Sequence, residues 1–475
     1  MQTEYDAIVV GSGPNGLAAA IKLQSEGLEV LLVEGKDTVG GGMRTMELTL
    51  PGFLHDVCSA VHPIAIASPY LSGLPLHEHG LEYILPEVDC AHPFDDGSAA
   101  HLERSVERTA RSLGADKEVY LDLYGPFKKN WKKIAPDVLG PLSIPSHPAE
   151  MLKFGLKALQ PATRFANRFT TEKGRGLWAG MAAHSLQPLT NWATSAIGLV
   201  LCVSGHTGGW PIAKGGSQSI ATALASYFSS LGGTIRTGLH VESLEQLPSA
   251  RAVLLDVTPR QLLEIAGHKF SSVYKWQLRR YRYGMGVFKI DWSLDGPIPF
   301  TAEVCRKAGT VHLGNTMEEI VYSEKEAEKG RLADKPFVLL AQQSLFDTTR
   351  APKGKHTAWA YCHVPHGSAE DRTAIIEEQV ERFAPGFKDL ILARNTMNTG
   401  AMQAYNPNYI GGDINGGIID IRQLFTRPAL RKSPYRTSAK GLYLCSSSTP
   451  PGGGVHGMCG YHAAMRVLKD MGFQR

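Results

Sequence analysis

Two glycine-rich segments near the N-terminus and one near the C-terminus contain the residue types that hold phosphate groups. The first, Gly11-Ser12-Gly13-Pro14-Asn15-Gly16, directly follows the apolar run 8–10 and precedes an alanine-rich stretch. In this pattern the first glycine permits a tight turn, the second lets the backbone approach a pyrophosphate, and the third lets helix and strand pack closely. A helix that begins here offers free N–H groups to phosphates. We therefore predict dinucleotide binding by a set of five residues: Gly11, Gly13, Pro14, Asn15 and Gly16.

An acidic residue in the right place strengthens this prediction. Glu34 ends the apolar run 30–33 and stands 18 residues beyond Gly16, where a carboxylate can bind the ribose hydroxyls of the nucleotide. The same carboxylate repels a 2′-phosphate, so NADP is disfavoured and NAD and FAD remain. The alternative is a tight turn followed by a surface glutamate.

The second segment, Val39-Gly40-Gly41-Gly42-Met43-Arg44-Thr45, is not needed for NAD. It resembles the Gly-Gly-Arg segment of FAD enzymes of the amine oxidase and phytoene desaturase superfamily. The resemblance implies that Gly41, Gly42, Met43 and Arg44 reach the pyrophosphate and ribityl chain of FAD. Gly42 occupies the usual arginine position and Arg44 comes two residues later, which leaves a surface arginine as the alternative.

The third segment runs from Gly441 to Gly457 and contains Pro450-Pro451-Gly452-Gly453-Gly454-Val455-His456. It resembles the closing FAD motif of phytoene desaturases, in which a helix N-terminus points at the flavin and stabilises its reduced, anionic form. The resemblance implies flavin contacts by Ser447, Gly454, Val455 and His456. Ser446 and Ser447 replace the Gly-Asp pair of many flavoproteins.

A middle segment completes the resemblance. Gly232-Gly233 and the following Val241 match the piece of the superfamily whose valine main chain meets the adenine. The likeness covers nearly the whole chain and is closest to phytoene-dehydrogenase-like proteins, which are often described as pyridine nucleotide–disulphide oxidoreductases. This chain has seven cysteines but no Cys-x-x-Cys pair, so a redox-active dithiol, zinc ribbons and common iron–sulfur spacings are excluded, and we expect no metal.

Three residues are candidates for catalysis. His456 is placed beside the flavin by the resemblance and can act as acid, base or hydrogen-bond donor. Lys289 belongs to the stretch 283–291, which resembles the amine oxidase segment whose lysine holds a water against flavin N5; strand alternation places it on one face with Val287 and Asp291. His206 lies in a glycine-rich stretch, 205–211, expected to form a turn over the flavin. The alternative for His456 is a structural histidine. For Lys289 it is a salt bridge on a sheet face, and for the stretch 205–211 it is an ordinary loop.

These motifs must be positioned by strand–helix units, and the hydrophobic pattern supplies them. Apolar runs at 8–10, 30–33, 252–257 and 442–445 alternate with helical patterns, whereas 76–204 is mostly helical and 275–430 is mixed. We predict an α/β fold with a discontinuous Rossmann-type FAD-binding domain (residues 1–75, 205–270 and 431–475) and an inserted mixed α+β substrate domain (76–204 and 271–430).

Composition narrows the location and partners. The chain has 49 Lys and Arg against 45 Asp and Glu, and no dense basic tract, so we expect no nucleic-acid partner. The scattered, odd number of cysteines and the short apolar runs favour a cytoplasmic protein without a membrane span. One basic amphipathic stretch, 151–169, suits peripheral membrane contact, although such a face usually packs on its own domain.

Together these features predict an FAD-dependent, phytoene-dehydrogenase-like oxidoreductase. It would move hydride from a largely apolar organic molecule to flavin N5 and be reoxidised by oxygen or a quinone. A flavin amine oxidase, supported by the Lys289 segment, is an alternative, although the sequence lacks an aromatic pair near the C-terminal motif. A flavin-dependent isomerase and a flavin-fold binding protein, as in Rab GDP-dissociation inhibitors, also stay open. The oligomeric state is unknown at this stage.

Overall fold

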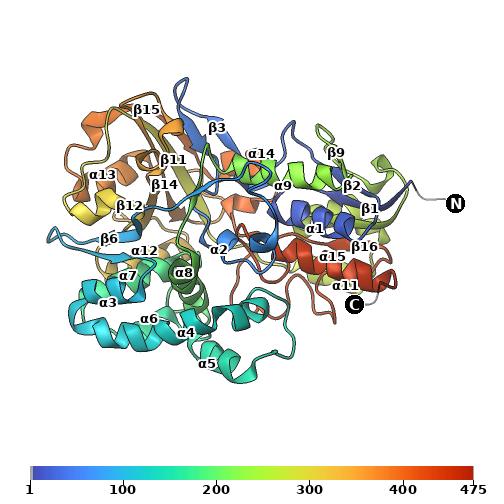
Figure 1. Cartoon of the computed structure of the whole chain (residues 1–475), viewed down its shortest axis with the longest axis horizontal. Coiled ribbons are helices and arrows are strands. Elements are labelled where there is room, and N and C mark those ends of the chain that lie inside the picture. Colours follow the sequence, from blue (N-terminus) through green and yellow to red (C-terminus); the bar gives the residue numbers. More distant parts are fainter. Residues whose placement is uncertain (1–3, 474–475) are drawn as a thin grey trace.

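The structure is a computed structural model of the 475-residue chain and describes residues 4–473. Residues 1–3 and 474–475, at the ends of the predicted FAD-binding segments, lie outside it. Two β-sheets lie at opposite ends of the molecule, with helices around both (Figure 1). Within the described range, none of the helices has the length and hydropathy needed to cross a bilayer.

The first sheet has five parallel strands in the order β16-β10-β1-β2-β9. Its strands are β1 (Tyr5–Val10), β2 (Val30–Val33), β9 (Thr234–Arg236), β10 (Ala250–Leu255) and β16 (Leu442–Leu444). The central strands are almost continuously apolar because helices cover both faces of the sheet. The predicted α/β class with a Rossmann-type parallel sheet is confirmed, and three separated parts of the chain build that sheet.

Helices pack on both faces of this sheet. The first face carries α1 (Pro14–Ser25), α9 (Gln218–Ser230) and α15 (Met458–Asp470), and the second carries α10 (Pro259–Ala266) and α11 (Ser272–Arg279). The closest packing joins α1 to α15: a Cβ atom on Gly460 would lie 1.8 Å from the carbonyl oxygen of Asn15. This contact holds the first and last glycine-rich segments side by side.

The second sheet has seven strands in the order β15-β11-β14-β13-β12-β6-β7, antiparallel except for the pair β12–β6. Its strands are β6 (Val88–Pro93), β7 (Ala99–Leu102), β11 (Gly286–Leu294), β12 (Ala308–Leu313), β13 (Val338–Ala341), β14 (His356–Val364) and β15 (Ile391–Met397). Phe288, Ile290 and Trp292 face α13 (Thr373–Phe383) in one apolar cluster. The alternate residues, including Lys289 and Asp291, lie on the opposite face, as predicted.

A layer of helices covers that opposite face. It comprises α3 (Val106–Ser112), α4 (Lys117–Val138), α5 (Pro148–Ala158), α6 (Ala162–Ala166), α7 (Glu172–Ala183), α8 (Thr194–Gly208) and α12 (Met317–Glu328). The segment 76–204 is therefore mostly helical, although β6 and β7 within it join the large sheet. The stretch predicted as a turn over the flavin instead continues α8 as far as Gly208.

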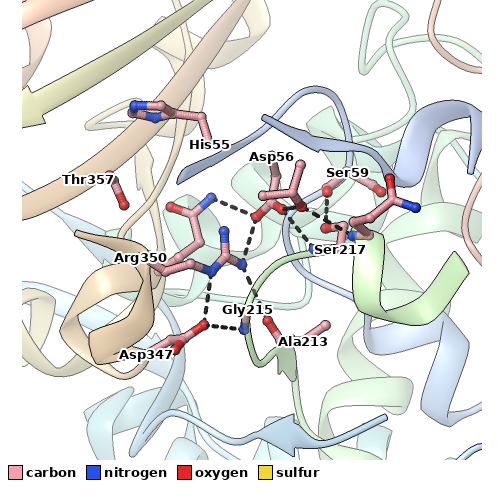
Figure 2. A network of polar contacts seen from close by, with 12 residues as sticks. His55, Asp56, Ser59, Ala213, Gly215, Ser217, Asp347, Arg350 and Thr357 are labelled. Atoms are coloured by element: carbon pink, nitrogen blue, oxygen red, sulfur yellow. Dashed lines mark hydrogen bonds and ion pairs between the residues drawn. The ribbon is translucent and has the colours of Figure 1, made fainter. Parts of the chain in front are cut away.

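Short elements connect the two halves. They are β3 (Thr45–Glu47), β4 (Leu54–Asp56), α2 (Pro63–Ile66), β5 (Tyr83–Ile84), β8 (Ile212–Ala213) and α14 (Thr399–Tyr405). At the end of β4, Asp56 is fully buried and pairs with Arg350, whose Nη2 lies 3.0 Å from its Oδ2 (Figure 2). Arg350 Nε also donates to Asp347 at 2.9 Å. One arginine thus binds two buried carboxylates.

Backbone groups extend this cluster toward the first sheet. The Ser217 N–H, just before α9, donates to Asp56 at 2.8 Å, and the Gly215 N–H donates to Asp347 at 2.7 Å (Figure 2). Burial raises the pKa of the Asp56 carboxyl, but Arg350 and the Ser217 N–H outweigh it, so this pKa lies below its usual value. Because Arg350 lies between β13 and β14, the cluster ties the seven-stranded sheet to the helix layer of the five-stranded one.

Removal of the arginine charge should therefore destabilise the whole molecule. Arg350→Met leaves two buried carboxylates unpaired, and we expect a loss of about 3–5 kcal/mol in the free energy of unfolding, measured by chemical denaturation. The triple variant Arg350→Met, Asp56→Asn, Asp347→Asn should recover much of this loss because no charge stays unpaired. An unchanged denaturation midpoint in the single variant would contradict the assignment.

Candidate functional site

One cavity of about 670 Å³ opens between the two sheets. Its first part lies at the carboxyl ends of the parallel strands of the five-stranded sheet, where such folds bind ligands. Its second part lies against the inner face of the seven-stranded sheet. We call these parts the glycine-lined end and the sheet-side arm, and one continuous lining joins them.

The glycine-lined end contains most of the residues predicted to hold a dinucleotide. Those that line it are Gly11, Gly13, Pro14, Asn15, Glu34, Gly41, Gly42, Met43, Arg44, Val241, Ser447, Gly454 and Val455. Gly16 does not line the cavity, but a Cβ atom there would lie 1.9 Å from the Gly11 carbonyl oxygen. It therefore has the predicted packing role, while Gly11 takes the tight turn at φ +100°.

Glu34 connects the first two glycine-rich segments. Its Oε2 accepts from the Ser12 N–H at 3.0 Å and from the Ser12 hydroxyl at 2.5 Å. Its Oε1 accepts from the Lys36 N–H at 2.9 Å and from Arg44 Nη2 at 3.1 Å. Arg44 is buried and also donates to the Gly41 carbonyl, so it is not a surface arginine. The carboxylate lines the cavity while it holds the loop in place.

The residues at this end fit an FAD-sized dinucleotide on three observations. Gly41 approaches Gly13 so closely that an added Cβ would lie 2.9 Å from the Gly13 Cα, which leaves a cradle lined by backbone. Asn15 donates to Ser447 at 3.4 Å, yet its buried Oδ1 has no partner among residues 4–473. The start of α1 presents N–H groups to this cradle.

Asp256, which directly follows β10, was missed by the sequence analysis. Its Oδ2 accepts from the Gly16 N–H at 3.0 Å, at the start of α1. Burial and then the charge of Glu34 raise its pKa to about 7, although the Gly16 N–H opposes the shift. A polar residue at the carboxyl end of a buried strand was the signal, because such ends converge in a parallel sheet.

The sheet-side arm has a different lining, formed by His184, Leu201, Trp210, Thr310, Leu339, Trp359 and Tyr361. Register places Tyr361 of β14 opposite Leu339 of β13 and opposite Lys289 of β11. The rings of Trp359 and Tyr361 lie 5.3 Å apart, nearly edge to face. These side chains come from distant segments with no common motif, so no local pattern predicted that they meet.

Lys289 and Asp291 form a buried ion pair on the same sheet face. Asn395 donates to Asp291 at 3.3 Å, and His55 Nδ1 lies 3.8 Å from its other oxygen. Lys289 does not line the cavity, although it lies beside Tyr361, which does. The sheet-face salt bridge weighed in the sequence analysis is therefore present, and the role of Lys289 toward the cofactor stays a prediction.

His456 does not line the cavity, and both of its ring nitrogens have partners within the protein. Its Nδ1 accepts from the Met458 N–H at 3.0 Å, and its Nε2 lies 3.2 Å from the Gly452 carbonyl. Burial lowers its pKa to about 4, so the ring is neutral at pH 7. Helix α15 begins only at Met458, so His456 serves that helix start instead of pointing from it.

His206 is also away from the cavity. It lies in the last turn of α8, is buried, and its Nε2 lies 2.8 Å from the Tyr120 hydroxyl. Burial lowers its pKa to about 4. The expected turn over the flavin is absent from this stretch because the helix continues through it, and Trp210 rather than His206 reaches the cavity.

The fold and this geometry agree with comparisons to known proteins. A family model described as flavin containing amine oxidoreductase matches residues 15–265, more than half of the chain. The pyridine nucleotide-disulfide oxidoreductase domain-containing protein 2 of Mus musculus is 25% identical, with 99% of this chain and 94% of that protein covered. The lycopene-forming phytoene desaturase of a Paracoccus species is 23% identical, with 96% and 95% covered.

A solved oxidoreductase structure from Methanosarcina mazei covers 98% of this chain and 99% of its own, with a TM-score of 0.66 at 16% identity. At that identity the likeness concerns the fold. The seven cysteines of the present chain are all free. Because the family model matches more than half of the chain, this chain belongs to the family of flavin-containing amine oxidoreductases, and its cofactor is FAD.

Proposed function

We propose that the protein oxidises a largely apolar small organic molecule by hydride transfer to the N5 atom of FAD, with reoxidation by oxygen or a quinone. The observation that carries this proposal is the continuous cavity between the two sheets, which joins a backbone-lined cradle to an apolar, aromatic arm. One part suits the cofactor and the other suits an apolar substrate, so the two reactants would meet where the parts join.

Backbone and buried polar groups would hold the cofactor. Bound FAD supplies a two-electron acceptor at flavin N5. The N–H groups at the start of α1 would face the pyrophosphate, and Glu34 would bind the adenosine ribose while keeping its bonds to Ser12. Val241 would contact the adenine, and Ser447, Gly454 and Val455 would lie along the ribityl chain and flavin. Glu34, Val241, Ser447, Gly454 and Val455 all line the cavity.

The sheet-side arm would exclude water and orient the substrate. Leu201, Leu339 and the rings of Trp210 and Trp359 present apolar surface, which favours transfer of an apolar molecule out of water. Lys289 and Asp291 neutralise each other beneath this surface. With Tyr361 between them and the cavity, the pair would orient that ring or hold a water near the reacting atoms.

Amine oxidation is the second candidate. The family to which the chain belongs is named for amines, and the structure supplies an aromatic pair, Trp359 and Tyr361, that the sequence did not place near the C-terminal motif. An un-ionised amine would lie against the cavity-facing sides of these two rings. Anaerobic reduction of the flavin by amines but not by hydrocarbons or alcohols would favour this candidate. Turnover without consumption of any electron acceptor would instead favour isomerisation.

Peripheral membrane contact through α5 is part of the same proposal, because it would give access to lipid-soluble substrates. Leu152 and Leu156 are each 63% exposed on this helix, and Trp192 beside it is 53% exposed. Lys153 and Arg168 lower the pKa of Lys157, after burial, which marks a positive cluster next to these apolar side chains. Exposed leucines with adjacent positive charge suit an anionic lipid surface.

The first prediction concerns the cofactor itself. The purified protein should be yellow, and acid precipitation should release all of its flavin into the supernatant because binding is non-covalent. Flavin that stays with the pellet would contradict non-covalent binding. A colourless protein that does not take up added FAD would overturn the proposed function.

The second prediction concerns Asp256. The pyrophosphate and the Asp256 carboxylate would both lie at the start of α1. Because the pyrophosphate is negatively charged, bound FAD favours the protonated form of this carboxyl. Since the pKa of Asp256 is already about 7, FAD affinity should fall as pH rises from 6 to 8.5. Nearby Cys445 and Cys459 have raised pKa values and stay neutral throughout.

Asp256→Asn should flatten this pH dependence and tighten FAD about threefold to tenfold at pH 8.5, measured by flavin fluorescence titration. Asp6→Asn, at the opposite end of β1, is the matched control and should keep the wild-type pH profile. A steeper profile in Asp256→Asn, or weaker binding at pH 8.5, would refute the repulsion.

The third prediction tests the membrane. Cosedimentation with vesicles that contain phosphatidylserine should exceed that with phosphatidylcholine alone, and Leu152→Glu with Leu156→Glu should lower it at least fivefold. Leu392→Glu, which alters a leucine of similar exposure on β15, serves as the control. Equal binding by the double variant and the wild type would rule out α5 as the contact.

A further inference from the structure

The sheet-side arm has a neutral lining with one imidazole in it. Its other members are leucines, aromatic rings and Thr310, and none carries a fixed charge. The ionisable groups on the same sheet face are paired: Lys289 with Asp291, and His363 with Glu324, which lies 2.7 Å from it. A charged ligand would therefore lose its hydration in this arm without gaining a counter-charge.

His184, directly after α7, is the imidazole. The ring is half-buried and lines the cavity, where it meets the Trp210 ring edge to face at 5.8 Å. Its Nε2 lies 2.9 Å from Nε2 of His312. Among residues 4–473, Nδ1 of His184 has no hydrogen-bond partner and is not enclosed by protein. One ring nitrogen is therefore held and the other faces open space.

His312 fixes the orientation of this ring from below. It is fully buried on β12, and its Nδ1 lies 3.4 Å from the Cys90 thiol. Helix α7 packs on it at Gly180, where an added Cβ would lie 2.7 Å from His312 Nδ1. The three side chains form a continuous hydrogen-bonded row from Cys90 through His312 to the cavity.

Both imidazoles in the row are neutral. Burial and then the charge of His363 lower the pKa of His184 to about 3, and burial with neighbouring His184 and His92 holds the pKa of His312 well below its usual value. One of the two Nε2 atoms must then donate and the other accept. If His184 Nε2 donates the hydrogen bond, Nδ1 of His184 is unprotonated and can accept one. If His312 Nε2 donates instead, Nδ1 of His184 carries a proton and can donate one. In that second arrangement, His312 Nδ1 accepts a hydrogen bond from the Cys90 thiol.

We propose that His184 recognises the substrate, and that the arm takes a neutral, largely apolar molecule with one hydrogen-bonding group, a hydroxyl, carbonyl or un-ionised amine, which binds His184 Nδ1. This inference rests on the proposed function and narrows its substrate class. His312 is a positioning residue that keeps Nδ1 aimed at the ligand. The two proton arrangements of the row let the same ring meet either a donor or an acceptor.

The test uses the FAD-loaded enzyme and three probes with one ring system: naphthalene, 2-naphthol and 2-naphthoate. Perturbation of the flavin absorbance gives each dissociation constant. We expect 2-naphthol to bind about fivefold to tenfold more tightly than naphthalene, the ratio that one net hydrogen bond supplies. The carboxylate should bind most weakly of the three.

His184→Phe should bring the ratio of the two neutral probes close to one by weakening 2-naphthol alone, while His184→Gln should keep part of it. His312→Leu should lower the same ratio at least twofold, although His312 does not contact the probe. This variant replaces His184→Phe as the test if His184→Phe does not retain flavin. His101→Phe, a partly buried histidine on β7 of the same sheet that pairs with Glu103 outside the cavity, is the matched control and should leave the ratio unchanged.

The inference would be overturned if His184→Phe kept the wild-type ratio of the two neutral probes. The same holds for His312→Leu where it replaces His184→Phe as the test. Preference of the wild type for 2-naphthoate, or failure of a yellow protein to bind either neutral probe, would overturn it as well. Loss of flavin binding by the wild type is a separate result and would count against the proposed function.

Discussion

The pairing of Arg350 with Asp56 and Asp347 is the contact on which the geometry of the cavity depends. It is fully buried and reaches β4, the segment before α9 and the connection between β13 and β14 (Figure 2). Charges buried in this way are stable only when all their partners are in place. The cluster therefore fixes how the seven-stranded sheet meets the helix layer of the five-stranded sheet, and with it the junction of the two parts of the cavity.

The two parts of the cavity differ in what they offer a ligand. The glycine-lined end presents backbone N–H groups and two carboxyl groups, those of Glu34 and Asp256. The sheet-side arm presents apolar side chains and a neutral imidazole, and the buried Lys289 and Asp291 on the same sheet face are paired with each other. In the proposed function, the chemistry of the lining would thus separate a charged, polar cofactor from a neutral substrate within one cavity.

Histidines illustrate how burial changes the role of a residue type. His456 and His206 satisfy backbone or phenol partners inside the protein, and their low pKa values follow from the loss of water around them. His184 has a similarly lowered pKa but keeps one nitrogen toward the cavity. The difference lies in which atoms remain unpaired once the chain has folded, not in the residue type or its local motif.

The sequence determined the nucleotide end almost completely. Gly11 to Gly16 and Glu34 are local patterns whose purpose follows from strand–turn–helix geometry, and they indicated the Rossmann-type sheet and a dinucleotide. FAD followed from the family resemblance of the segments 39–45 and 441–457. The domain limits and individual site residues remain predictions. Only the tertiary structure determined the lining of the sheet-side arm. Its residues Tyr361, Trp359, His184 and Trp210 meet through sheet register and helix packing. Such contacts join residues far apart in the chain, and no short motif encodes them.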